Sequence, residues 1–297
     1  MNFRTEISIG RFPFILSPQK PIVSVGSCFS SNMAARMLQH GWEAVNPCGT
    51  LYNPLSILIA LSLLIDNDKG KGEFEKSLFE SDGLWHSHLF DSSFSSLNRN
   101  DCIEEFLLQQ IKLKESLKAG SALIVTFGTS LFYHLKANGQ IVGNCHKQLS
   151  SLYFRKRLTV GEIIDNWRTL HTYLRKSFPE LKIIFTVSPV RHLKDGFIEN
   201  AKSKAVLLLA VEELCNSLKD CFYFPAFEIM NDDLRDYRYY AGDMVHPSEV
   251  AIDYIWELFI KSFLNEEGVR LLREGKKLFQ AQHHRPLTGA LGRSLHL

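Results

Sequence analysis

The sequence predicts an α/β protein built on a parallel β-sheet. Short apolar segments at 22–26, 122–127 and 182–187 are rich in β-branched residues and have the composition of buried strands. Segments with apolar residues at helical spacing lie between them, as at 101–117 and 160–177. Strands that alternate with helices imply parallel pairing through right-handed crossovers. A chain of 297 residues, of which 45% are hydrophobic, can bury the core that such a sheet needs.

The first elements follow in order along the chain. Residues 1–20 contain two prolines and are expected to form an extended lead-in. The strand at 22–26 leads into a helix at 29–40, and Gly41 is a plausible C-cap for it. A second strand is expected at 42–45.

The next helix and an insertion occupy the segment before residue 101. Asn53 is expected to cap a helix at 54–65, because Pro54 suits the first helical position. This helix is apolar on almost every side and should be buried. Residues 66–100 are rich in serine and aromatic residues, and we interpret them as an insertion with short strands near 77–79 and 85–90. The aromatic residues of the insertion are expected to form either a substrate-facing cap or a small satellite core.

The second half of the chain continues the alternation of strands and helices. Residues 131–158 are expected to be irregular or hairpin-like, with a turn at Asn138-Gly139. Four later elements are predicted, namely a helix at 198–219, a strand at 221–224, an acidic and tyrosine-rich segment at 226–242, and a helix at 248–264. Residues 265–297 are expected to form a helix followed by a poorly ordered tail.

Composition argues against several classes of function. A net charge of +2 does not indicate a general nucleic-acid binder. The longest apolar run, 55–65, is too short to span a bilayer, and no signal peptide is recognisable at the N-terminus, so no membrane partner is expected. The cysteines are scattered without CxxC spacing, which fits a reducing compartment, and the cytoplasm is the expected location.

Ser27 occupies the position in the chain that best suits a catalytic group. It follows the strand at 22–26 and precedes the first helix, so it should lie at the carboxyl edge of the sheet. Open α/β sheets bind ligands at this edge, and a helix N-terminus favours developing negative charge. The alternative is that Ser27 only caps the helix.

Asp243 and His246 could complete a catalytic arrangement with Ser27. Acyl transfer needs a nucleophile, a base within hydrogen-bond reach, a group that orients the base, and donors for the oxyanion. In Asp-x-x-His both side chains lie on one turn, so the carboxylate can reach the imidazole. The alternative is a loop that caps its own helix. Ser27 lacks the following glycine that a Gly-x-Ser-x-Gly elbow requires, which argues against an ordinary α/β-hydrolase.

Several motifs in order resemble the GSCFA family of bacterial proteins, a branch of the SGNH (GDSL-like) esterase and lipase superfamily. They are Val25-Gly26-Ser27-Cys28-Phe29-Ser30, Asn46-Pro47-Cys48-Gly49-Thr50-Leu51-Tyr52-Asn53-Pro54, Phe127-Gly128-Thr129, Asn144-Cys145-His146-Lys147, Ser188-Pro189-Val190-Arg191 and Asp243-Met244-Val245-His246-Pro247. The resemblance covers most of residues 1–260. It implies a flavodoxin-like three-layer α/β/α fold over 1–264, with the insertion at about 66–100 and a C-terminal helix and tail at 265–297.

The resemblance also implies a function and a set of roles. SGNH proteins hydrolyse esters, often acetyl groups on carbohydrates, and no cofactor is expected. Ser27 would be the nucleophile, His246 the base and Asp243 its partner. The oxyanion would be bound by the N–H groups of Ser27 and Gly49 and by a third donor.

The third donor departs from the family pattern. The superfamily usually has Gly-x-Asn-Asp after the third strand, whereas this chain has Ser130 where the asparagine belongs. Either Ser130 donates or Asn144 from the following loop takes over, and we favour Asn144. His146 and Arg191 are expected to line the substrate cleft.

Other groups could carry different chemistry. Cys28 is expected to be a small buried residue. His86 and His88 could be metal ligands on a strand, although we favour a structural role for them, and the set Cys145, His146 and His192 lacks a second paired motif for zinc. His283 and His284 are expected to be solvated in the tail. The acids Asp232, Asp233 and Asp236 are expected to form a solvated face rather than a metal site. The main hypothesis is therefore a serine esterase. The alternatives are a non-catalytic ligand-binding module on the same fold and a metal-dependent hydrolase.

Overall fold

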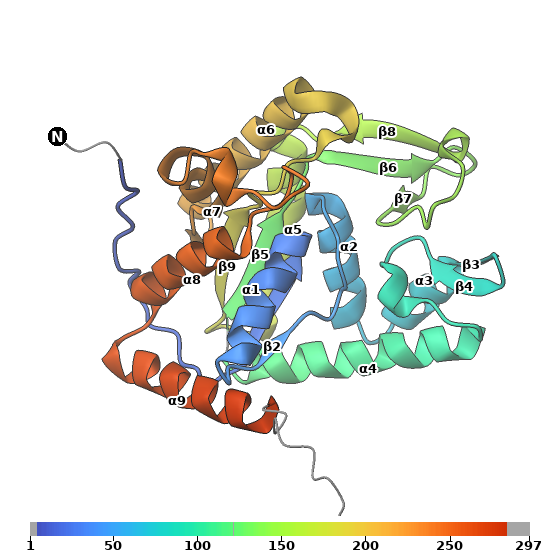
Figure 1. Ribbon diagram of the computed structural model, residues 1–297. Coiled ribbons are helices and arrows are strands. Elements are labelled where there is room, and N and C mark those ends of the chain that lie inside the picture. The colour runs from blue at the N-terminus through green and yellow to red at the C-terminus, as the bar shows by residue number, and fades with distance from the viewer. Residues whose placement is uncertain (1–4, 121, 284–297) are drawn as a thin grey trace, which may run out of the picture.

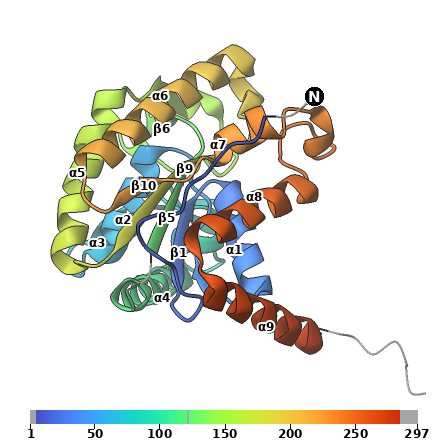
Figure 2. The ribbon, with the colours of Figure 1, turned by 90° about the vertical axis from the view of Figure 1, so that its left-hand side faces the viewer.

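A computed structural model describes residues 5–120 and 122–283, and it confirms the α/β fold with a parallel sheet. Five strands pair side by side in the order β10-β9-β5-β1-β2, and every pairing is parallel. Numbered along the chain this order is 2-1-3-4-5, the flavodoxin-like order that the resemblance implies. The strands are β1 (Ile22–Gly26), β2 (Ala44–Val45), β5 (Ala122–Phe127), β9 (Lys182–Val187) and β10 (Cys221–Tyr223) (Figure 1 and Figure 2).

The sheet is buried on both faces because successive side chains point to opposite sides of a strand. In β5, Leu123 and Val125 pack into one hydrophobic cluster, whereas Ala122 and Ile124 pack into the other. Continuous apolar strands are therefore needed at the centre of the sheet, which explains why these segments were recognisable in the sequence.

Helices cover the two faces as a three-layer fold requires. One face is covered by α2 (Pro54–Ile65), α4 (Arg99–Lys118), α5 (Val160–Ser177) and α6 (Gly196–Ser217). The other is covered by α1 (Cys28–Gln39), α8 (Glu249–Phe263) and α9 (Glu266–His283). Figure 2 shows α5 and α6 on one side of the strands and α1 and α8 on the other.

Local signals fix the starts of several helices. The Asn53 side chain accepts a hydrogen bond from the N–H of Ser56 at 2.8 Å, and Pro54 is the first residue of α2, as predicted. Thr159 and Glu162 form a reciprocal capping box at the start of α5. These caps satisfy backbone N–H groups that have no partner inside a helix.

The predicted insertion contains a helix and a hairpin. The strands β3 (Leu78–Ser81) and β4 (Leu84–Ser87) pair antiparallel, close to the two predicted short strands. The helix α3 (Gly70–Lys76) was not predicted. Its Phe74 ring stacks on Phe106 at 4.5 Å and also meets the buried rings of Phe90 and Phe94. These aromatic residues thus form a satellite core rather than a cap over the site.

Residues 131–158 form a second small sheet that the sequence predicts only in part. The strands β6 (Leu131–Leu135) and β7 (Ile141–Val142) make the expected hairpin. β8 (Tyr153–Arg157) adds to the other edge of β6, also antiparallel. This sheet lies beyond the carboxyl ends of the main strands, where it can wall a cavity (Figure 1).

The C-terminal part continues from β10 into a short helix, α7 (Ala226–Glu228), and an irregular segment before α8. The predicted C-terminal helix is present as α9, and the tail predicted after it lies outside the described residues. Within the described ranges, no helix combines the length and the apolar character needed to cross a membrane.

Candidate active site

Ser27 lies between β1 and α1, at the point where the sheet order reverses between β1 and β5. Its side chain is buried, and it makes no capping hydrogen bond to α1. The Oγ atom has no hydrogen-bond partner among the described residues. A buried hydroxyl without a partner is unusual and calls for a ligand or a functional reason. The structure thus gives Ser27 no capping role that would explain it.

Gly26 makes this turn possible. Its φ of +127° lies in a region that side chains rarely adopt, and a Cβ there would lie 2.1 Å from the Thr126 carbonyl oxygen. The neighbouring Ser27 N–H donates to the same oxygen at 3.1 Å. The close approach of β1 and β5 therefore depends on glycine at position 26. This approach places Ser27 directly at the edge of the sheet.

Asp243 and His246 contact each other as the Asp-x-x-His spacing predicts. The imidazole Nδ1 lies 2.6 Å from the Asp243 Oδ2 atom. The other carboxylate oxygen accepts the N–H groups of Val245 at 2.9 Å and His246 at 3.0 Å. These hydrogen bonds, those from His246 above all, lower the pKa of Asp243 to about 2. The carboxylate is therefore ionised at neutral pH and can orient the ring with Nε2 free to accept a proton.

The loop that carries His246 is tied to the loop that follows β9. The N–H of Arg191 donates to the Val245 carbonyl at 3.2 Å, and its guanidinium donates to the Met244 carbonyl at 3.4 Å. The same guanidinium lies 3.9 Å from the centre of the Tyr240 ring, a cation–π contact. Ser27 and His246 are not hydrogen-bonded to each other, since the Ser27 hydroxyl has no partner. The structure therefore forms the Asp–His contact but not the Ser–His contact.

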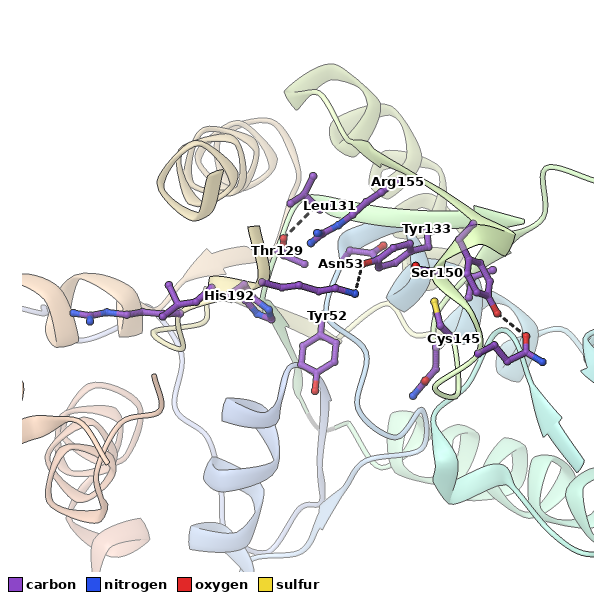
Figure 3. A pocket seen from close by; sticks show the side chains of 17 residues that line it. Tyr52, Asn53, Thr129, Leu131, Tyr133, Cys145, Ser150, Arg155 and His192 are labelled. Carbon is purple, nitrogen blue, oxygen red and sulfur yellow. Dashed lines mark hydrogen bonds between the residues drawn. The ribbon is translucent and has the colours of Figure 1, made fainter. Parts of the chain in front are cut away.

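A cavity of about 420 Å³ opens at this edge of the sheet. Its walls come from the start of α2, the loop after β5, the small sheet, the segment 142–150 and the loop after β9 (Figure 3). The lining residues are Tyr52, Asn53, Thr129, Leu131, Tyr133, Val142, Gly143, Asn144, Cys145, Gln148, Ser150, Tyr153, Arg155, Arg191, His192, Leu193 and Lys194. This volume is within the range of small-molecule sites.

The expected oxyanion donors differ in whether their N–H or O–H groups are already engaged in hydrogen bonds. The Ser27 N–H already donates to Thr126. Ser130 is fully buried, and both its N–H and its hydroxyl bond to the Ser203 hydroxyl, at 2.7 and 3.1 Å. Asn144 lines the cavity, and its side-chain oxygen accepts the N–H of His146, which leaves the amide NH₂ group to donate. Of the two residues considered for the third donor, Asn144 has the freer donor group.

Gly49 lies beside β1, because its neighbour Thr50 bridges to Gly26. Its φ is +65°, and a Cβ there would lie 2.2 Å from a carboxylate oxygen of Asp91. That carboxylate accepts the Thr50 N–H at 2.6 Å. The position therefore requires glycine, and its backbone runs along the same edge as Ser27.

Of the two residues expected to line the cleft, one lines the cavity and the other does not. Arg191 lines the cavity, as described above. The His146 ring instead lies under the insertion, where its Nε2 atom is 2.8 Å from the Ser87 carbonyl oxygen and 3.2 Å from that of Phe90. His146 is absent from the cavity wall because these contacts hold its ring against the insertion.

Two residues near the site have contacts that we did not infer from the sequence. Lys204 of α6 is buried and donates to the carbonyls of Gly128 and Ser188, both at 2.6 Å. It therefore joins the ends of β5 and β9. The spacing of Lys204 with Leu207 and Val211 placed it on the buried face of the helix, a signal that was available in the sequence.

His192 is the second such residue, and the sequence suggested it only as part of a metal set. Its ring lines the cavity beside Tyr52, with the two ring centres 5.3 Å apart. Burial, followed by the charges of Lys204 and Arg155, lowers the pKa of His192 to about 3, and His246 contributes as well. The ring is therefore neutral at physiological pH.

Cys28 and the described residues considered as metal ligands are buried or contact other protein groups. Burial raises the pKa of the Cys28 thiol. His86 contacts the Ser95 hydroxyl at 2.7 Å, and His88 stacks on Phe79 at 3.9 Å. Asp232 and Asp236 pair with arginines. Asp233 accepts a hydrogen bond from Tyr254. Within residues 5–120 and 122–283, no group of three or more His, Cys, Asp or Glu side chains is arranged to hold a metal ion. His283 is the last described residue, and His284 lies beyond it.

These observations define an α/β protein with a cavity at the carboxyl edge of a flavodoxin-ordered sheet. The chain belongs to the GSCFA family, whose model matches residues 21–259. No curated protein matches the chain.

Proposed function

We propose that the protein is a serine esterase of the SGNH type that hydrolyses a small acyl ester, such as an acetyl ester on a carbohydrate. The observation that carries the proposal is the Asp243–His246 pair on the same sheet edge as the buried, unpartnered hydroxyl of Ser27. The adjoining cavity has the size and the polar, aromatic lining that a sugar ester would need. Its location is proposed to be the cytoplasm, because the cysteines lack the paired spacing of a disulfide framework.

The reaction follows from the roles of these side chains. His246 Nε2 takes the hydroxyl proton of Ser27 as the Ser27 oxygen attacks the ester carbonyl, and Asp243 stabilises the imidazolium that forms. The tetrahedral intermediate collapses, the bond to the alcohol breaks, and the alcohol leaves with the proton from His246. Water then attacks the acyl-serine with His246 again as base, which releases the acid and restores Ser27.

The oxyanion of each intermediate needs hydrogen-bond donors in place before reaction. We assign this role to the N–H of Gly49 and to the amide of Asn144, because Ser130 is occupied by Ser203. The Ser27 N–H contributes only if it exchanges its bond to Thr126. Losing one oxyanion donor typically lowers the rate by about 10²–10³-fold.

One rearrangement is required before the first attack. The Ser27 hydroxyl must turn toward His246, because the two are not hydrogen-bonded in the structure. Catalytic hydrogen bonds often tighten only when substrate binds, so this geometry fits an enzyme without ligand. It also fits the alternative function, a ligand-binding module in which Ser27 never reacts.

Acetate release from acetylated sugars and from 4-nitrophenyl acetate tests the proposal. The native protein should hydrolyse at least one of these esters, and Ser27→Ala and His246→Ala should not. Ser217→Ala is a matched control, because this serine lies outside the cavity lining and its hydroxyl donates to the Glu213 carbonyl within α6. Equal rates for the native protein and Ser27→Ala would refute the serine mechanism. Binding of a sugar without turnover would favour the binding module.

A further inference from the structure

Two basic side chains line the cavity wall formed by β8 and the loop after β9. Arg155 extends from β8, and Lys194 from the loop after β9. The lining contains a third cation, Arg191, but no aspartate or glutamate. Asp195, which is next to the lining, forms an ion pair with Arg155. The wall therefore has more positive than negative charge.

Both cations lie against the ring of Tyr133. The Arg155 guanidinium lies 5.1 Å from the ring centre and the Lys194 ammonium 5.4 Å from it. Lys194 also donates to the Tyr133 hydroxyl at 3.1 Å. Lys194 has no carboxylate partner within the described part of the chain. A bound anion would be attracted to this unpaired ammonium in a wall of net positive charge.

The charges act on the interior of the cavity. Arg155 is among the groups that lower the pKa of His192, after burial and Lys204. Burial raises the pKa of Cys145, and Lys194 and Arg155 oppose that rise. Both His192 and Cys145 line the cavity, so the positive field reaches across it (Figure 3).

The cavity wall lies next to the nucleophile, although Ser27 itself is buried and is not one of the lining residues. Tyr52 and His192 line the cavity, and both approach Gly128, next to the Ser27 side chain. A substrate with its ester carbonyl at Ser27 would thus extend its remaining part toward Tyr133.

We propose that the substrate carries an anionic group, a carboxylate or a phosphate, which binds between Lys194 and Arg155 while its ester lies at Ser27. This inference rests on the proposed function and names its substrate class: small acyl esters of acidic sugars or sugar phosphates. The aromatic and amide side chains of the wall, Tyr133, Tyr153, Asn144 and Gln148, suit the hydroxyl groups of such a sugar.

The test compares acetyl esters that differ in charge. The substrates are an acetylated neutral hexose, the matching acetylated uronic acid and the matching acetylated hexose phosphate. The native protein should show at least about tenfold higher kcat/KM for one of the anionic esters, and added salt should reduce this preference. Lys194→Met should raise KM for the anionic ester about five- to tenfold and leave the neutral ester unchanged. Lys202→Met is the control, because Lys202 lies outside the lining and pairs with Glu199.

Equal kcat/KM for neutral and anionic esters, or the same effect of Lys194→Met on both, would overturn the inference without touching the esterase proposal. If no ester is turned over, the esterase proposal fails, and calorimetric binding of the free uronic acid, hexose phosphate and hexose still tests the anion site. Tighter binding of an acid than of the hexose, lost in Lys194→Met, would support it. Equal binding, or none, would refute it.

A second inference rests on two other atoms, the Ser27 hydroxyl oxygen and the His192 Nε2. Neither has exposed surface or a hydrogen-bond partner among the described residues. Both side chains approach the same face of Gly128. A Cβ built on Gly128 would lie 2.9 Å from His192 Nε2 and 3.2 Å from Ser27 Cβ. Two unpartnered buried polar groups that converge in this way define a place for a polar atom of a ligand.

The two histidines near Ser27 have different environments. His246 is partly exposed and bonded to a carboxylate. His192 is held by Tyr52 and by the Asn200 side chain, which accepts its backbone N–H at 2.9 Å, and cations surround it. Histidines in such contrasting environments are suited to different roles in one reaction.

We infer that His192 donates an Nε2–H hydrogen bond to the oxyanion formed at Ser27, as a further donor beside Gly49 and Asn144. This inference also rests on the proposed function. His192→Phe should lower kcat about 10²-fold with little change in KM, and His192→Asn, which keeps an N–H donor, should recover part of that loss. The acidic limb of the kcat/KM profile should keep its midpoint in both variants, because His246 remains the base.

Equal losses in His192→Phe and His192→Asn, or no loss in either, would refute donation by His192. A shifted acidic limb would make His192 the base instead. Circular dichroism and thermal unfolding of both variants separate these outcomes from a loss of folding, and His192→Gln provides a second donor variant if His192→Asn does not fold.

Discussion

Replacing Lys204 with methionine is expected to change how the stability of the protein depends on pH. The Lys204 ammonium is buried with two carbonyl oxygens at 2.6 Å, and no carboxylate of the described residues pairs with it. Burial lowers its pKa from 10.5 to about 7, although the charge on Cys28 opposes the shift. Methionine has a similar length and no titratable group, so the variant isolates this effect.

The sign follows from proton binding in the two states. Between about pH 7 and the ordinary pKa of 10.5, the unfolded chain keeps the Lys204 proton that the folded protein has released. The free energy of unfolding therefore rises with pH across this window, by at most about 1.4 kcal/mol per pH unit, and is flat below it. Between about pH 7.5 and about pH 9.5, the free energy of unfolding of the native protein should therefore rise by about 2 to 2.5 kcal/mol relative to that of Lys204→Met.

Urea unfolding monitored by tryptophan fluorescence measures this difference at the two pH values. Lys202→Met, in the same helix but with half of its side chain exposed, should show no such pH dependence. A native-minus-variant difference that is equal at both pH values would show that Lys204 has an ordinary pKa, and the reasoning from its burial would be wrong.

Four further substitutions test other parts of the structure. Gly26→Ala should prevent folding, because the added Cβ would lie 2.1 Å from the Thr126 carbonyl oxygen; the yield of soluble protein and its circular dichroism check this. Phe74→Ala should lower the free energy of unfolding by about 3 to 5 kcal/mol, since it empties the centre of the insertion core, and urea unfolding measures the loss. Thr159→Ala should cost about 1 kcal/mol in the same assay, because the α5 capping box is lost. Asp243→Asn should lower kcat by about 10²–10⁴-fold, because the carboxylate that orients His246 is lost. In the native enzyme Asp243 has a pKa of about 2, so this carboxylate should stay ionised across the neutral range and should not itself produce an acidic limb there.

The strands at the centre of the sheet could be predicted because their burial leaves a direct mark on the sequence. β1, β5 and β9 have the bounds that the apolar segments indicate. β8 could not be predicted in this way, since its arginines face inward and Phe154 is 54% exposed. Arg155 and Arg157 are tolerated there because Asp195 and Glu199 pair with them from the loop and helix that follow β9. That compensation is tertiary and leaves no local pattern.

Local patterns and tertiary contacts also contribute differently at the candidate site. The contact between Asp243 and His246 closes within one turn, so spacing alone predicts it. Ser130 is taken out of the site by Ser203, which is 73 residues later in the chain. The approach of His192 to Ser27 likewise requires β1 and β9 to be assembled on either side of β5. Local motifs thus indicate individual groups, whereas the fold decides which of them meet.

The most direct test of the central claim is the intact mass of the protein after exposure to a fluorophosphonate. The account predicts one adduct on the native protein, none on Ser27→Ala, and strongly slowed labelling of His246→Ala. No adduct on the native protein, or an equal adduct on Ser27→Ala, would contradict an activated Ser27.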